Sequence, residues 1–192
     1  MTHHDHGQHT GDSRRGFLRR AALASGGVAG LAATSSGGRV IDFRARAGVA
    51  GKAAKVARDG EPLGIGVIGT GGMGHAHIRS IFGLLEGGRA ENVEFRALCD
   101  VNDLHAGAAK ETCDAQQSFA CDTYRDHRKL LERDDIHGVL IATTEHQHAS
   151  IAIDALRAGK DVYLEKPMTL RLGEALELRE AVKANPDKIY QV

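Results

Sequence analysis

The segment at residues 63–74, Leu-Gly-Ile-Gly-Val-Ile-Gly-Thr-Gly-Gly-Met-Gly, decides the fold of this chain. Its first half, residues 63–68, is a short apolar run that predicts a buried strand. The second half has the spacing Gly-x-Gly-x-x-Gly, and apolar residues then recur at helical spacing from Ile78 to Leu85. A strand, a glycine turn and a helix are therefore expected in immediate succession.

The glycine turn has the chemistry of a dinucleotide site. Gly69 permits a tight turn, Gly71 lets the backbone approach a pyrophosphate without a Cβ in the way, and Gly74 lets the helix pack on the strand. Backbone N–H groups at the start of the helix then face the phosphates, where the helix dipole favours negative charge. The candidate cofactor-binding residues of the turn are Gly69, Thr70, Gly71, Gly72, Met73 and Gly74.

Asp100 ends the second expected strand, at residues 93–100, and supplies the acidic residue that such a site needs. Its carboxylate is placed to accept hydrogen bonds from the adenosine ribose hydroxyls, and it would repel a 2′-phosphate. None of the next three residues, Val101, Asn102 and Asp103, is basic. The sequence therefore predicts NAD as the cofactor, with NADP less favoured.

Strands and helices continue to alternate along the rest of the chain. This alternation predicts the α/β class, with a doubly wound parallel sheet (Rossmann fold) built as one domain over residues 62–192. Helices are expected at residues 103–117, 126–133, 148–158 and 173–184, and strands at 118–121, 138–143, 161–165 and 189–192.

The first part of the chain resembles a twin-arginine export signal. Ser-Arg-Arg-Gly-Phe-Leu-Arg at residues 13–19 precedes a weakly apolar stretch at residues 21–33. Residues 1–47 are interpreted as signal and leader, and residues 48–61 as a linker, together a disordered segment. The twin-arginine export machinery is then an expected partner, and the protein is expected to be exported, either periplasmic or membrane-anchored through the leader. The cleavage site stays open.

Charge and cysteine content narrow the remaining classes. The 25 Lys and Arg are balanced by 25 Asp and Glu, so no nucleic-acid partner is expected. The three cysteines lack zinc spacing and are expected to be free thiols. No metal is predicted, because nothing would hold the histidines near the N-terminus in place and His146 and His148 are only two residues apart.

Three further features point to one family. His77 follows Gly74 by three residues, residues 142–149 read Ala-Thr-Thr-Glu-His-Gln-His-Ala, and residues 163–169 read Tyr-Leu-Glu-Lys-Pro-Met-Thr. With the glycine turn they resemble the amino-terminal half of the Gfo/Idh/MocA family of nicotinamide-dependent oxidoreductases, which includes glucose-fructose oxidoreductase and inositol dehydrogenase. The resemblance implies an oxidoreductase acting on a sugar, polyol or related hydroxyl substrate.

The resemblance also implies residue roles. Lys166, the catalytic candidate, would lie by the nicotinamide, where an ammonium stabilises negative charge developing on a hydroxyl oxygen. Glu165 would contact the cofactor or the lysine, or form a plain salt bridge, and Thr143 would touch the cofactor near its ribose and phosphates. His148 is a further cofactor-site candidate, better suited to packing or a helix start than to acting as a base. The two residues after Thr143 depart from the Pro and Asn or Asp usual in the family, which puts the rigidity of that loop in doubt.

The family's second domain binds substrate, supplies an acid/base and commonly forms the oligomer interface, and no counterpart to it is found before Val192. The chain is therefore expected to bind NAD but to be inactive alone, and to form homo-oligomers only with that domain. Three function hypotheses remain: an exported dehydrogenase, a redox-neutral NAD-dependent glycoside hydrolase, and a nucleotide-binding module without catalysis. Glu-Lys-Pro at residues 165–167 favours the dehydrogenase.

Overall fold

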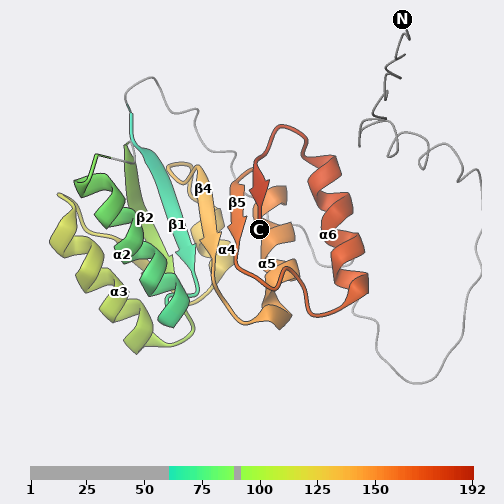
Figure 1. The fold of residues 1–192 in the computed structure, drawn as a ribbon, viewed down its shortest axis with the longest axis horizontal. Coiled ribbons are helices and arrows are strands. Elements are labelled where there is room, and N and C mark those ends of the chain that lie inside the picture. Colours follow the sequence, from blue (N-terminus) through green and yellow to red (C-terminus); the bar gives the residue numbers. More distant parts are fainter. Residues whose placement is uncertain (1–60, 89–91) are drawn as a thin grey trace, which may run out of the picture. The chain divides into compact units, whose positions relative to one another are not determined.

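The computed structural model describes residues 61–88 and 92–192 (Figure 1). The expected leader, and all but the last residue of the expected linker, lie outside the described residues and stay predictions. The helices and strands of the described part are β1 (Leu63–Ile68), α2 (Gly72–Glu86), β2 (Val93–Cys99), α3 (Asp103–Gln116), β3 (Asp122–Tyr124), α4 (His127–Leu131), β4 (Gly138–Ile141), α5 (Glu145–Arg157), β5 (Asp161–Leu164), α6 (Leu172–Ala184) and β6 (Tyr190–Gln191).

The strands form one six-stranded sheet in the order β3-β2-β1-β4-β5-β6, and every neighbouring pair is parallel. This confirms the doubly wound sheet. Strands β1, β2 and β3 follow one another toward one edge of the sheet. The chain then crosses back, and β4 pairs with the other side of β1. Open α/β sheets bind ligands beside the carboxyl ends of their strands at such a reversal. The topology therefore indicates a ligand site at the carboxyl ends of β1 and β4.

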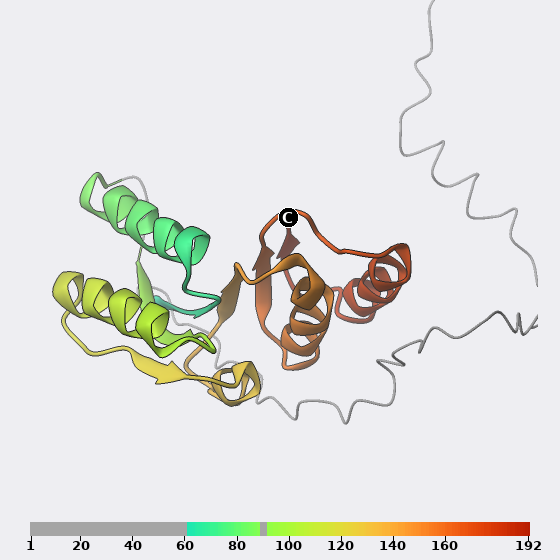
Figure 2. The same ribbon diagram turned by 90° about the horizontal axis from the view of Figure 1, so that it is seen from below.

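Two hydrophobic cores lie on the two faces of the sheet. Helices α2 and α3 cover one face, and α4, α5 and α6 lie on the other (Figures 1 and 2). Because side chains alternate along a strand, Val67 and the next residue, Ile68, enter different cores. In the core under α2, the rings of Phe82 and Phe95 meet edge to face with centroids 5.2 Å apart. Burial of one such side chain stabilises the fold by about 1.5–3 kcal/mol.

At two positions of the glycine turn, the backbone conformation or the packing requires glycine. Gly69 has φ +88°, a left-handed conformation that side chains disfavour, which confirms its expected place in a tight turn. At Gly74, a Cβ would lie 1.9 Å from the carbonyl oxygen of Gly69, so α2 packs directly on the end of β1. The close packing expected of Gly74 is thereby confirmed.

Two expected elements are wrong in position. The strand expected at residues 118–121 is β3, which pairs with β2 only from Asp122 onward. The backbone N–H of Cys121 donates instead to Asp114 Oδ1 of α3, at 2.9 Å, so it is not free for the strand ladder. The helix expected from residue 148 begins at Glu145, whose carboxylate in the first turn favours an earlier start through the helix dipole.

No helix among residues 61–88 and 92–192 has the length and apolar character needed to cross a membrane.

Candidate cofactor-binding site

A cavity of about 540 Å³ lies where the sheet order reverses, at the carboxyl ends of β1 and β4. It extends along the ends of β1, β2 and β4 and is flanked by the starts of α2, α3 and α5. Five of the predicted site residues line it: Gly69, Gly71, Met73, Asp100 and Thr143. The structure therefore brings together residues that lie up to 74 positions apart in the sequence.

At the start of α2, beside this cavity, no side chain of the N-cap or the first turn offsets the positive end of the helix dipole. Its N-cap, Gly71, offers no side-chain hydrogen bond, and the first turn holds no acidic residue. By contrast, the Asn102 side chain caps α3 and the Asp126 side chain caps α4. The free N–H groups and the positive end of the α2 dipole are therefore available to an anion in the cavity.

Unlike Gly69 and Gly74, Gly71 is not required by the fold. A Cβ at this position would meet only the His105 ring, at 3.5 Å, which is an ordinary van der Waals distance. The fold therefore leaves room for a side chain at Gly71. Its absence keeps the backbone accessible from the cavity, as a phosphate-binding turn requires.

Asp100 is held rigidly at the end of β2. Its Oδ2 accepts hydrogen bonds from the backbone N–H of Thr70 at 2.8 Å and from the Thr70 hydroxyl at 3.3 Å, and its Oδ1 accepts from the Asn102 N–H at 2.9 Å. Thr70 is 1% exposed, so its observed role is to tie the glycine turn to Asp100. Each carboxylate oxygen can accept about two hydrogen bonds, so Oδ1 keeps capacity for a ribose hydroxyl.

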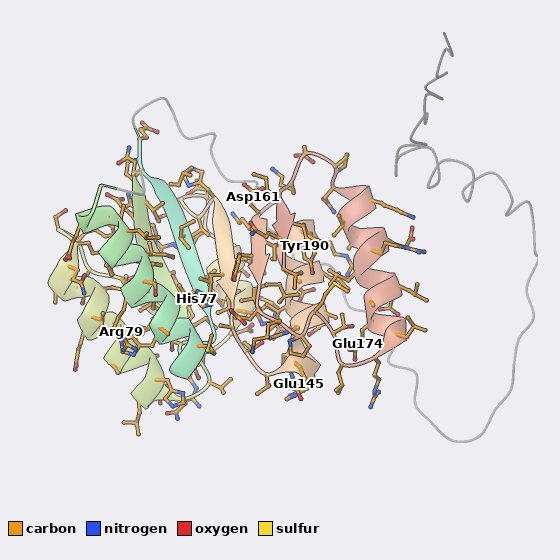
Figure 3. The ribbon with its side chains drawn as sticks, in the orientation of Figure 1. His77, Arg79, Glu145, Asp161, Glu174 and Tyr190 are labelled. Atoms are coloured by element: carbon orange, nitrogen blue, oxygen red, sulfur yellow. The ribbon has the colours of Figure 1, made fainter. Side chains whose placement is uncertain are left out.

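Glu165 is paired with a histidine that the sequence marked only as a family feature. His77 Nε2 donates to Glu165 Oε1 at 2.7 Å, and the His77 ring packs edge-on against Tyr163. Figure 3 shows His77 on the flank of α2 that faces β4 and β5. The hydrogen bond from His77 holds the pKa of Glu165 below its ordinary range. Glu165 Oε2 also accepts the backbone N–H of Lys166 at 3.1 Å, whereas the Lys166 side chain is exposed.

His148 connects the loops that follow β4 and β5. Its Nδ1 lies 2.7 Å from the carbonyl oxygen of Pro167, and its Nε2 lies 3.0 Å from that of Thr143. The ring therefore lies between backbone carbonyl groups of the two loops. His148 is 1% exposed and does not line the cavity, which fits the packing role anticipated for it. Its contact with a cofactor stays a prediction.

Sequence reasoning missed three cationic or titratable side chains that line the cavity. One is His127 of α4, which lies 3.0 Å from Asp154. The other two lie at the Asp100 end. His105 comes from α3, with Nδ1 3.8 Å from Asp100 Oδ2, and Arg125 follows β3. No local spacing marks either residue, because each reaches the cavity from a separate element. Within the residues that the structure describes, no group of three or more His, Cys, Asp or Glu side chains could hold a metal ion.

Comparison with known proteins places this geometry in a family. The Gfo/Idh/MocA description, an oxidoreductase family with an NAD-binding Rossmann fold, matches residues 63–192. The chain belongs to the Gfo/Idh/MocA family. The inositol 2-dehydrogenase of Gluconacetobacter diazotrophicus is 36% identical over 132 residues, which cover 68% of this chain and 36% of that protein.

Two further members extend the comparison. A crystal structure of myo-inositol dehydrogenase from Lactobacillus casei, in complex with NAD(H) and myo-inositol, superposes with a TM-score of 0.60 at 27% identity, over 68% of this chain and 36% of that one. Glycosyl hydrolase family 109 protein 1 of Shewanella sp. strain ANA-3 is 31% identical over 170 residues, 86% of this chain and 36% of that protein. This Gfo/Idh/MocA chain thus spans little more than a third of the length of these relatives.

We expect Glu165→Gln to reduce the free energy of unfolding by about 1.5–3 kcal/mol at pH 7, because it removes a charge-assisted hydrogen bond. A lowered pKa means that the carboxylate stabilises the fold above its unfolded-state pKa of about 4.3, and that this stabilisation is lost as pH falls through the native value. Denaturant unfolding of both proteins at pH 7 and at about pH 3 measures the difference.

Glu180→Gln is the matched control, since Glu180 also pairs with basic side chains but is 59% exposed, and we expect no measurable change in its free energy of unfolding. An equal loss for Glu165→Gln at both pH values would contradict the interpretation.

Proposed function

We infer that this chain is the cofactor-binding part of an NAD-dependent dehydrogenase that oxidises a hydroxyl group of a sugar, polyol or related substrate. The observation that carries the proposal is the cavity at the β1/β4 reversal, which has an uncapped helix start on one side and an oriented carboxylate on the other. A pyrophosphate needs the first and a ribose diol the second. The inositol dehydrogenases among the relatives favour a polyol substrate.

In this proposal different residues of the chain bind the cofactor, orient groups in the site and stabilise charge on the substrate. The turn from Gly69 to Gly74 holds the pyrophosphate, and Asp100 accepts the ribose hydroxyls. NAD, when bound, supplies the hydride acceptor. Lys166, exposed after β5, is free to place its ammonium beside a substrate hydroxyl and to stabilise negative charge on that oxygen. The His77–Glu165 pair fixes the backbone of Lys166, so the lysine extends from an anchored point.

NAD is proposed over NADP from the same contacts. The Asp100 carboxylate is fixed by Thr70 and Asn102 and cannot turn away without breaking their hydrogen bonds. A 2′-phosphate placed against it would bring two negative charges together in a partly dehydrated cavity. His105 and Arg125 lie nearby, but Arg125 is paired with Asp103 at 2.6 Å.

A redox-neutral glycoside hydrolase is the second candidate. The Shewanella glycosyl hydrolase family 109 protein aligns over 86% of the chain, whereas residues 62–192 make up only 68%, so that similarity reaches into the first 61 residues. The two candidates share the cofactor site and differ in outcome. A dehydrogenase accumulates NADH, whereas the hydrolase releases an aglycone with no net change in NAD.

We also propose export of the protein by the twin-arginine route, to the periplasm or to a membrane anchor, on the basis of the motif at residues 13–19. This route transports folded proteins, so NAD bound in the cytoplasm would cross with the protein.

For the cofactor, we expect calorimetry to give tighter binding of NAD than of NADP, and Asp100→Ala to narrow the gap by about 1–3 kcal/mol, the magnitude of a charge-assisted hydrogen bond. Asp187→Ala is the control, because Asp187 is also acidic but pairs with Lys188 and is absent from the cavity lining. Equal binding of both cofactors by the unmodified protein would exclude the assignment of Asp100.

For the reaction, we expect protein expressed from the complete reading frame to form NADH from NAD and myo-inositol or a related polyol. Lys166→Ala should lower kcat by about 10²–10⁴-fold while leaving NAD affinity within about threefold, because the lysine acts on the hydroxyl proton and oxygen. Release of nitrophenol from a nitrophenyl glycoside without NADH would identify the hydrolase instead. Unchanged kcat in the variant would remove Lys166 from the reaction.

For export, we expect replacement of Arg14 and Arg15 by lysine to retain the protein in the cytoplasm, measured by cell fractionation and blotting. The control replaces Arg19 and Arg20 by lysine. It makes the same change of residue type, keeps the charge, and leaves Arg14 and Arg15 of the motif intact. The proposal fails if both double variants fractionate with the periplasm or membrane like the parent.

A further inference from the structure

Two buried cysteines lie side by side at the end of α3 that is remote from the cofactor cavity. Cys113 is in the last turn of α3 and is 0% exposed, and Cys121 directly precedes β3 and is 2% exposed. Both belong to the core under α2 and α3, whereas Cys99 belongs to the core on the other face of the sheet. All three thiols are free. Nothing in the proposed reaction uses Cys113 or Cys121.

The backbone at Cys121 is fixed to α3 by side chains of that helix. Its N–H donates to Asp114 Oδ1 at 2.9 Å, and its carbonyl oxygen accepts from Lys110 Nζ at 2.7 Å. Lys110 and Asp114 are themselves paired one helical turn apart, at 2.7 Å. The segment that returns from the helix therefore has one position along α3, and that position sets Cys121 against Cys113.

The two thiols also contact each other directly. The Cys113 thiol hydrogen-bonds the Cys121 sulfur, and together with burial this raises the pKa of Cys113. Cys121 Sγ in turn donates to the carbonyl oxygen of Phe95 at 2.9 Å and accepts from Gln117 Nε2 at 3.2 Å. Two buried sulfurs in one core, on backbones held together by the Asp114 and Lys110 contacts, form an arrangement suited to a disulfide.

We propose that Cys113 and Cys121 form a reversible intramolecular disulfide when the protein meets a low-molecular-weight disulfide such as oxidised glutathione. The thiolate of one cysteine attacks the oxidant and gives a mixed disulfide and one released thiol. The second cysteine then displaces the bound half as another thiol. The two S–H protons pass to the released thiolates, the protein thiols are oxidised and the oxidant is reduced.

Burial of the two sulfurs slows their reaction with an oxidant and also favours a bond within one chain over a bond between chains. An oxidant reaches either sulfur only when the exposed connection between Gln117 and Cys121 opens locally. Once a mixed disulfide forms, the partner thiol is adjacent and no other thiol can enter the core. The resulting bond closes a loop of nine residues and joins the end of α3 to the start of β3.

Peptide mapping tests the bond. The 192-residue protein is incubated under native conditions with oxidised glutathione, denatured, alkylated with iodoacetamide and digested with trypsin. Both cysteines fall in one tryptic peptide, residues 111–125, and Cys99 in another, so Cys99 is an internal control. We expect the first peptide to lose two hydrogen atoms and take no alkyl group, the Cys99 peptide to be alkylated, and reductant to reverse the change. Chymotryptic cleavage after Phe119 should then leave two fragments joined by the bond.

Thermal unfolding supplies a second measurement that does not depend on how a variant folds, because each protein is compared with itself before and after oxidation. Oxidation should raise Tm by roughly 5–10 °C in the parent and in Cys99→Ala, from the loss of loop entropy in the unfolded chain. It should leave Tm unchanged in Cys113→Ala and in Cys121→Ala. Persistent glutathione adducts, bonds between two copies of the chain, bonding that includes Cys99, or full alkylation of the 111–125 peptide after native oxidation would each overturn the proposal.

Discussion

The contact between α2 and the end of β1 is the constraint on which the site depends. Because Gly74 rests against the carbonyl oxygen of Gly69, the first turn of α2 lies directly over the end of the central strand. The N-cap residue of α2, Gly71, has no side chain that could cap the helix. The unsatisfied N–H groups point into the cavity as a result. The uncapped helix start that is proposed to hold the pyrophosphate is thus placed by the close packing of α2 on β1.

A second consequence concerns the reactive end of the site. Helix α2 carries His77 on the flank facing β4 and β5, and His77 holds Glu165 after β5. Glu165 holds the backbone of Lys166, and His148 ties the next residue, Pro167, back to the end of β4. The loops after β1, β4 and β5 are therefore cross-linked by side chains of α2 and α5. A shift in α2 would displace Glu165 and the phosphate-facing turn together.

Much of this arrangement could be predicted from the sequence, and the exceptions share a cause. The glycine turn, β1, β2, β4 and β5 were placed within about two residues, because period, glycine spacing and strand length are local signals. Five of the predicted site residues line one cavity, because the strands that precede them are parallel and end at one edge of the sheet. The misplaced β3 and the early start of α5 depended on side-chain hydrogen bonds and on a helix dipole. The His77–Glu165 pair joins residues 88 positions apart, a distance at which spacing carries no information.

The arrangement of Asp100 shows why one residue can serve both fold and ligand. Thr70 occupies Oδ2 with two hydrogen bonds, so that oxygen is committed to holding the turn on β2, whereas Oδ1 accepts only the Asn102 N–H. The fold therefore fixes the orientation of the carboxylate that is proposed to accept the ribose hydroxyls. The cofactor preference proposed for this position would follow from the same hydrogen bonds, which join the glycine turn after β1 to the end of β2.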